Sequence, residues 1–239
     1  MMNKKYIEDI REFLFSKKDE DYKEFTAKII PNIDSESIIG VRTNVLRKYA
    51  RVLSKDEEVE IFLKDLPHKY YEENQLHAFI IEKEKDYSSL IKHLDDFLKY
   101  VDNWATCDSL SPVLFKKEKE KTKDYILKLL DSDKTYKTYV KRFAIVSSLK
   151  FYLKEELDMD LFDKIMKIHS QEYYLNMAIA WYMSYVIIHH YDFSIKYLEE
   201  NDLSDFVFSM SIRKALDSRQ VYKDRKENLK RMRMQKNKS

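Results

Sequence analysis

Glycine is nearly absent from this sequence, whose 239 residues include one glycine and three prolines. Tight turns between β-strands usually need residues that adopt positive φ, and glycine is the residue that does so most readily. A sheet protein of this length would need many such turns. The scarcity of glycine therefore predicts an all-α fold in which short polar links join the helices.

Apolar residues recur at spacings of three and four along the whole chain, which is the pattern of amphipathic helices. We expect helices over residues 3–16, 19–30, from 43 onward, 57–63, 71–84, 87–100, around Trp104, 119–130, 136–152, 159–168, 171–189, 191–200, 203–216 and 219–234. Helices of this length with short links are typical of paired-helix solenoids. Although no strict repeat period is present, we predict a HEAT-like paired-helix solenoid, curved with a concave basic groove, as a single domain over residues 1–239. A closed helical bundle is the alternative.

The second helix and the turn after it carry distinct predictions. Tyr22, Phe25 and Ile29 are expected to face inward from helix 19–30. The lone glycine, Gly40, marks a turn that needs a special backbone shape or a close approach. Thr43 is a natural N-cap for the helix that follows.

Two arginines, Arg42 and Arg47, flank the N-terminus of that next helix. Backbone amides at a helix N-terminus can hold a phosphate, and arginine side chains nearby would strengthen the site. The alternative is an ordinary capped helix on the surface.

Several classes of protein are disfavoured by the composition. The longest apolar run, residues 177–188, is too short to cross a bilayer, and the N-terminus turns amphipathic at once without a secretory apolar region. The lone cysteine, Cys107, allows no internal disulfide, which fits a reducing compartment. These features predict a cytoplasmic protein with no membrane partner.

Metal and cofactor motifs are also missing from the sequence. The six histidines show no His-Glu-x-x-His spacing, and one cysteine rules out zinc-knuckle patterns. Glycine-rich phosphate loops and Gly-x-Ser-x-Gly nucleophile elbows cannot exist in a chain with one glycine. The sequence predicts neither a metal nor a cofactor.

Charge is unevenly distributed along the chain. From Arg213 to the end, eleven Lys or Arg residues stand against three acids, a net charge of +8, which leaves −6 on the preceding residues. Such a basic segment could meet a polyanion, or it could be a solvated last helix.

Three separated clusters could carry chemistry. Trp104 and Asp108 lie four residues apart, so a helix would place an indole and a carboxylate on one face, where they could stabilise a developing cation. Lys141 and Arg142 lie in the first turns of a helix whose other face is apolar, and Trp181 lies in the most apolar helix. In a solenoid, equivalent helices line one face, so the three clusters could share a groove. The alternative is that the tryptophans are core residues and that Asp108 or Asp102 caps a helix.

Taken in order, Gly-Val-Arg-Thr at 40–43, Val-Asp-Asn-Trp-Ala-Thr-Cys-Asp at 101–108, Lys-Arg-Phe-Ala-Ile at 141–145, Ala-Ile-Ala-Trp at 178–181 and Ile-Arg-Lys-Ala at 212–215 resemble the AlkD-like DNA alkylation repair family. These proteins are HEAT-like repeat DNA glycosylases. The resemblance implies hydrolysis of the N-glycosidic bond of cationic N3- or N7-alkylated purines in double-stranded DNA, by a monomer without metal.

The resemblance also implies roles for individual residues. Asp108 would be the catalytic carboxylate, Trp104 and Trp181 the aromatic walls, and Arg142 the residue that grips the DNA backbone beside the lesion. The further DNA contacts implied are Arg42, Arg47, Lys141, Arg213 and Lys214. A non-catalytic DNA-structure binder and a HEAT-like protein-interaction scaffold are the alternative functions.

Overall fold

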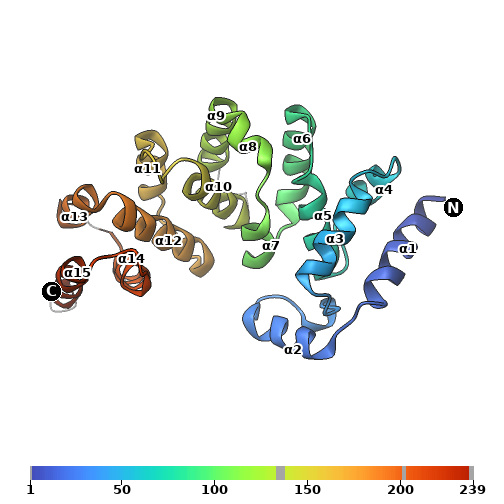
Figure 1. The fold of residues 1–239 in the computed structure, drawn as a ribbon, viewed down its shortest axis with the longest axis horizontal. Helices are drawn as coiled ribbons and strands as arrows, with labels where there is room; N and C mark the ends of the chain where they lie inside the picture. Colours follow the sequence, from blue (N-terminus) through green and yellow to red (C-terminus); the bar gives the residue numbers. More distant parts are fainter. Residues whose placement is uncertain (1, 133–137, 201–202, 237–239) are drawn as a thin grey trace. The chain divides into compact units, whose positions relative to one another are not determined.

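The computed structural model describes residues 2–132, 138–200 and 203–236, and every regular element within them is a helix (Figure 1). Helices pack against one another in pairs, such as α3 with α5, α10 with α12 and α12 with α14. The predicted all-α architecture of a helical-repeat solenoid is therefore confirmed. By its internal contacts the chain divides into two compact units, residues 1–119 and 120–239. The single domain and the concave groove stay predictions.

The first unit alternates α-helices with short links. Its elements are α1 (Met2–Phe15), α2 (Glu20–Ile29), η1 (Ser35–Ser37), α3 (Thr43–Leu53), α4 (Val59–Lys64), α5 (Tyr71–Ile81), α6 (Tyr87–Phe97), η2 (Leu98–Tyr100), α7 (Trp104–Ser109) and α8 (Val113–Lys117). Side chains of Asp19, Asp86 and Asn103 cap α2, α6 and α7 by accepting backbone N–H groups of the first turn. The sequence predicted these helices except the short elements η1 and α8.

The lone glycine permits a close backbone approach, as predicted. Gly40 has a φ of 97°, and a Cβ there would collide with the carbonyl oxygen of Asp19 and crowd Lys23. The Gly40 carbonyl also accepts a hydrogen bond of 3.1 Å from the backbone N–H of Asp19. This approach fixes which face of α2 turns inward.

The prediction of which residues of α2 face inward was wrong, because the buried positions lie one residue later in the sequence. Phe25 and Ile29 are 54% and 40% exposed, whereas Thr26 and Ile30 are buried. Because the turn at Gly40 packs against the start of α2, the helix is rotated by about one residue from the face that apolar spacing alone selects.

The predicted cap of α3 was also wrong. Thr43 is the first residue of the helix, and Arg42 occupies the N-cap position without a side-chain cap bond. The Thr43 hydroxyl instead lies 3.2 Å from the Tyr22 hydroxyl on α2. The Thr43 hydroxyl therefore contacts a neighbouring helix and does not cap its own helix.

Helix α5 is buried from Glu72 to Ile81, although four polar residues open it. The carboxylate of Glu72 accepts backbone N–H bonds of 2.8, 2.7 and 3.1 Å from Ile39, Gly40 and Val41. Burial raises the pKa of Glu72, while these three donors oppose the rise. Glu72 thus holds the turn that leads into α3.

The second unit contains longer and more apolar helices. Its elements are α9 (Lys119–Asp131), α10 (Thr138–Phe151), α11 (Met159–Met166), α12 (Tyr173–His189), α13 (Tyr191–Glu200), α14 (Asp205–Asp217) and α15 (Lys223–Lys236). The predicted start of the α10 helix, at 136, lies outside the described residues. Of the helices that the structure describes, none combines the length and apolar character needed to cross a membrane.

Candidate functional site

Helix α7 carries the first pair of predicted site residues. Trp104 and Asp108 are both partly exposed and stand one turn apart on this helix, as their spacing predicted. The side chain of Asn103 caps the helix by accepting the Thr106 N–H at 2.8 Å. Neither Asp102 nor Asp108 is therefore the cap of α7, which removes one alternative reading of these carboxylates.

The indole of Trp104 is fixed by its own N–H group. Nε1 donates to the carbonyl oxygen of Ile29, at the end of α2, over 3.1 Å. Because the polar edge of the ring is occupied by this bond, a ligand can meet Trp104 through the face of the ring. A ring face is the part of an indole that attracts cations.

A buried glutamine joins α7 to α5. The Gln75 amide donates to the hydroxyl of Thr106 at 3.1 Å, and its oxygen accepts from the hydroxyl of Ser109 at 3.3 Å. Gln75 and Thr106 are 3% and 0% exposed. Helix α7 is only six residues long, and so short a helix is not stable through its own backbone hydrogen bonds. The side-chain bonds from Gln75 stabilise it and fix its rotation about its axis. Cys107, between Thr106 and Asp108, is buried and forms no disulfide.

Arg47 of α3 lies against the end of α7. Its guanidinium pairs with Glu82 at 2.8 Å, stacks 4.0 Å from the centre of the Phe79 ring and reaches the carbonyl oxygen of Ser109. A cation at the last carbonyl groups of a helix stabilises that helix. Arg47 thus supports α7, and its predicted role in binding DNA stays a prediction.

Arg42 is also ion-paired in this structure. Its guanidinium binds the carboxylate of Asp19 at 2.7 Å and lies over the ring of Tyr22. The backbone N–H of Tyr22 and the charge of Arg42 together hold the pKa of Asp19 below its usual value. The side chain of Arg42 remains 57% exposed.

In the second unit, Arg142 is buried at the start of α10. It is 6% exposed, and one of its NH groups donates to the carbonyl oxygen of Tyr174 on α12 at 2.6 Å. Its neighbour Lys141 is partly exposed on the same turn. The family resemblance implied that Arg142 grips DNA, and this stays a prediction; in the structure Arg142 ties α10 to α12.

Trp181 belongs to a partly exposed stripe on α12. Tyr174, Met177, Trp181, Tyr185 and Ile188 follow one another at helical spacing, and all five are neither buried nor fully exposed. Trp181 meets Tyr185 edge-on, with ring centroids 6.2 Å apart. Because Arg142 contacts the Tyr174 carbonyl at the start of this stripe, the arginine and the indole belong to packed helices of one unit.

The last two predicted DNA contacts lie on α14. Arg213 is exposed and Lys214 is partly exposed, near the end of the helix. Helix α14 packs on α12, which carries Trp181. Within each unit the structure thus brings predicted residues onto packed helices: Trp104, Asp108 and Arg47 in the first, and Lys141, Arg142, Trp181, Arg213 and Lys214 in the second.

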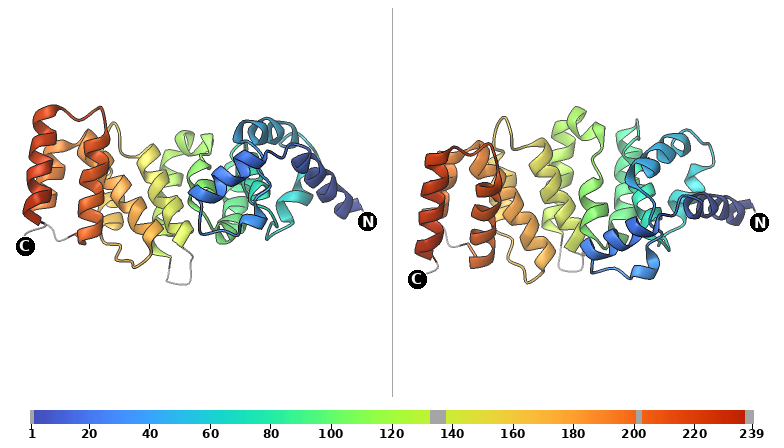
Figure 2. Two further views of the ribbon diagram at one scale, coloured as in Figure 1. Left: turned by 90° about the horizontal axis from the view of Figure 1, so that it is seen from below. Right: turned by 60° about the horizontal axis from the view of Figure 1, so that its bottom comes forward.

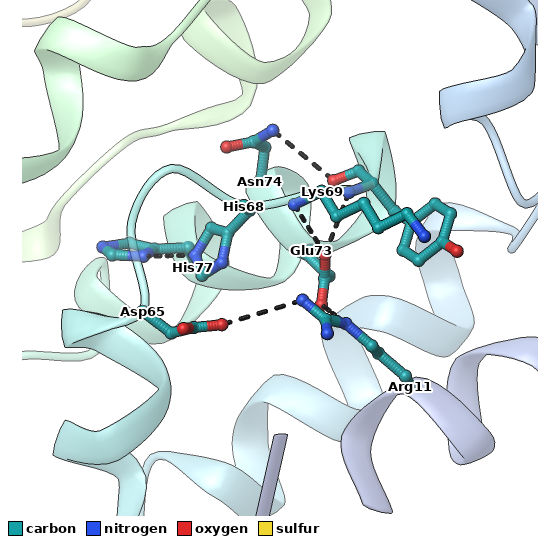
Figure 3. A network of polar contacts seen from close by, with 8 residues as sticks. Arg11, Asp65, His68, Lys69, Glu73, Asn74 and His77 are labelled. Carbon is teal, nitrogen blue, oxygen red and sulfur yellow. Dashed lines mark hydrogen bonds and ion pairs between the residues drawn. The ribbon is translucent and has the colours of Figure 1, made fainter. Parts of the chain in front are cut away.

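A buried polar network was missed by the sequence reasoning (Figure 3). Glu73 binds Arg11 of α1 at 2.7 Å and accepts the backbone N–H groups of Lys69 and Tyr70. Next to it, Nε2 of His68 lies 2.9 Å from Nδ1 of His77. The sequence assigned residues 72–75 to a helix without predicting that they are buried, and the one signal of burial is the mostly apolar stretch 76–81 that follows.

No group of three or more His, Cys, Asp or Glu side chains among the described residues is arranged to hold a metal ion. The histidine pair is buried, and among the described residues no salt bridge joins either ring to a carboxylate. Burial lowers the pKa of His68 to about 3 and lowers that of His77 well below its usual value. Both rings are therefore neutral groups inside the fold at neutral pH.

Comparison with known proteins places the sequence in a family. No curated protein matches it closely enough to imply relationship. The model of a family described as DNA alkylation repair enzyme matches residues 10–218, and this range contains all the predicted site residues. The chain therefore belongs to the DNA alkylation repair enzyme family.

Proposed function

We propose that this protein is a DNA glycosylase that hydrolyses the N-glycosidic bond of cationic N3- or N7-alkylated purines in double-stranded DNA. The observation that carries the proposal is the pairing of Trp104 and Asp108 on α7, in a chain of the DNA alkylation repair family. The proposed enzyme acts as a monomer and needs no metal.

The chemistry demands little beyond electrostatics. An alkylated purine with a positive charge leaves as a neutral base when its bond to the sugar breaks, and the sugar becomes an oxocarbenium ion. The carboxylate of Asp108 stabilises this cation and orients the water that adds to it. One proton of the water stays in the new sugar hydroxyl, and the other passes to solvent.

The two indoles provide surfaces for the cation. Trp104 has its N–H bound to the Ile29 carbonyl, so the orientation of its ring is set before DNA arrives. Trp181 lies in the partly exposed aromatic stripe of α12 and is the second proposed wall. Attraction between a cation and an indole face contributes about 0.5–2 kcal/mol for each contact.

Cationic side chains would hold the duplex by its phosphates. Arg142 is the proposed contact beside the lesion, with Lys141 next to it. Arg42, Arg47, Arg213 and Lys214 are the proposed contacts further away. Phosphate contacts give affinity and register without reading sequence, which suits an enzyme that must examine all DNA.

The test is release of base from duplex DNA that contains N7-methylguanine. Wild-type protein should release the base in the presence of EDTA, and Asp108→Asn should lose at least about a hundredfold in the single-turnover rate, because one electrostatic group at the reacting centre contributes this much. Asp192→Asn is the matched control, since Asp192 is an exposed aspartate on α13. Both variants should keep the wild-type circular dichroism.

The other outcomes identify the alternatives. Duplex binding without base release from wild-type protein would make this chain a non-catalytic DNA-structure binder. Absence of both activities, with a protein partner that co-purifies, would make it an interaction scaffold. An Asp108→Asn variant as fast as wild type would refute the assignment of the carboxylate.

A further inference from the structure

Helix α15 lies beyond the segment that matches the family. The family match ends at residue 218, and α15 spans Lys223–Lys236. The helix carries seven Lys or Arg residues against Asp224 and Glu227. Nothing in the proposed reaction uses this helix, so its charge needs a separate explanation.

The helix is attached to the fold along one side. Leu229 and Met232 are buried, and α15 packs on α14, as the two views of Figure 2 show. The Arg225 guanidinium lies 4.3 Å from the centre of the Tyr191 ring, and Asn228 donates to the Tyr191 hydroxyl at 3.1 Å. These contacts hold α15 to α13 and α14 and fix which side faces outward.

Four of the cations form a continuous row beside the buried side. Lys223, Lys226, Lys230 and Arg233 recur at intervals of three, four and three residues, so they lie within one face of the helix. Lys223 and Lys230 are exposed, and Lys226 and Arg233 are partly exposed. We call this row the α15 basic stripe.

The four cations of the basic stripe form no salt bridge with a carboxylate in the part of the chain that the structure describes. Glu227 lies one turn from Lys223 and from Lys230, so one acid stands beside four cations without an ion pair. By contrast, the exposed Lys28, Lys64 and Lys196 each pair with an acid on their own helices. Unpaired like charges along one helix face repel one another and cost stability, so a ligand of opposite charge is expected to offset them.

We propose that the α15 basic stripe binds the phosphate backbone of duplex DNA, outside the segment that the family model matches. Ten residues of helix rise about 15 Å, which matches the axial rise of about four nucleotides along one strand of B-DNA. Four long side chains can therefore meet successive phosphates. The stripe requires a duplex ligand but not base release, so its failure is separate from failure of the glycosylase proposal.

The test measures the salt dependence of binding to an undamaged duplex by fluorescence anisotropy. Replacing Lys223, Lys226, Lys230 and Arg233 with Gln should reduce the slope of log K against log salt by about 3.6, since each of the four phosphate contacts contributes about 0.9. The affinity near 100 mM salt should fall at least about tenfold. Full-length protein is used throughout.

Two control variants make the result specific. Lys4, Lys5, Lys55 and Lys92 are exposed or partly exposed lysines in the first unit, and replacing all four with Gln changes the net charge by the same amount. This control should keep the wild-type slope. Changing the three lysines of the stripe to Arg should also keep it, because the charges remain.

The following outcomes would overturn the proposal. They are an unchanged slope in the stripe variant, an equal loss in the control with the same net charge, or no binding of wild-type protein to duplex DNA at low salt. A larger loss of binding to anionic lipid vesicles than to DNA in the stripe variant would also overturn it, because the ligand would then be a membrane surface. Wild-type base release, measured in parallel, reports on the glycosylase proposal alone.

Discussion

The bridge from Gln75 to α7 makes a prediction that depends on no assumption about function. Gln75→Met keeps the length of the side chain and removes both of its hydrogen bonds to α7. It leaves the hydroxyl of Thr106, which is 0% exposed, without its glutamine partner. Ser109 keeps its bond of 3.0 Å to the Thr106 carbonyl, so most of the cost falls on Thr106.

The size of the effect follows from the two bonds. A net intramolecular hydrogen bond contributes about 1 kcal/mol, and leaving a buried hydroxyl unsatisfied costs about 1–3 kcal/mol. We therefore expect Gln75→Met to lower the free energy of unfolding of the first unit by about 2–4 kcal/mol. Thr106→Val removes the other partner, so the two changes together should cost about 1 kcal/mol less than their sum.

The assay is urea unfolding followed by tryptophan fluorescence. In a Trp181→Phe background, Trp104 is the remaining tryptophan and reports on α7 directly. Gln235→Met serves as the matched control, because Gln235 is exposed on α15 and its loss should change stability by less than about 0.5 kcal/mol. A coupling energy of zero between Gln75 and Thr106 would refute the bridge, even if each single variant were destabilised.

Three further predictions concern the first unit. Gly40→Ala should lower the free energy of unfolding by about 1–3 kcal/mol, because φ is 97° and the new Cβ meets the Asp19 carbonyl, and urea unfolding measures this. Glu72→Gln should cost about 1–3 kcal/mol, because an amide cannot accept all three N–H groups of the turn, and faster hydrogen exchange at those amides would show it. His68 and His77 are held neutral, so the unfolded chain takes up their protons below about pH 6.5 while the folded chain does not, and stability should fall as the pH drops from 6.5 toward 3. Replacing both histidines with Phe should remove up to about two protons from the slope of stability against pH, and an unchanged slope would contradict this account.

Local pattern predicted most of the helices and the geometry of α7. Helix spacing placed Trp104 and Asp108 one turn apart, and the scarcity of glycine alone argued against a sheet fold. The resemblance to the family rested on short motifs in order, and the family match over residues 10–218 confirms it. These features are all local in sequence.

Features that depend on contacts between distant residues could not be predicted. The rotation of α2 follows from the approach of Gly40, and the burial of Glu72 and Gln75 follows from partners 31 to 34 residues away. The pairing of Arg42 with Asp19 likewise needed the fold. Apolar periodicity cannot identify a buried polar residue, because it counts such residues as solvent-facing.

The rate at which a reagent modifies the single thiol of this chain reports how often α7 opens. Cys107 is 1% exposed and lies one residue before Asp108, so a thiol reagent can reach it only after the helix has left its place. Under conditions where reclosing is faster than labelling, the rate of modification measures the free energy of that opening. Labelling with and without DNA would therefore tell whether the ligand holds the proposed catalytic segment shut, with no engineered probe.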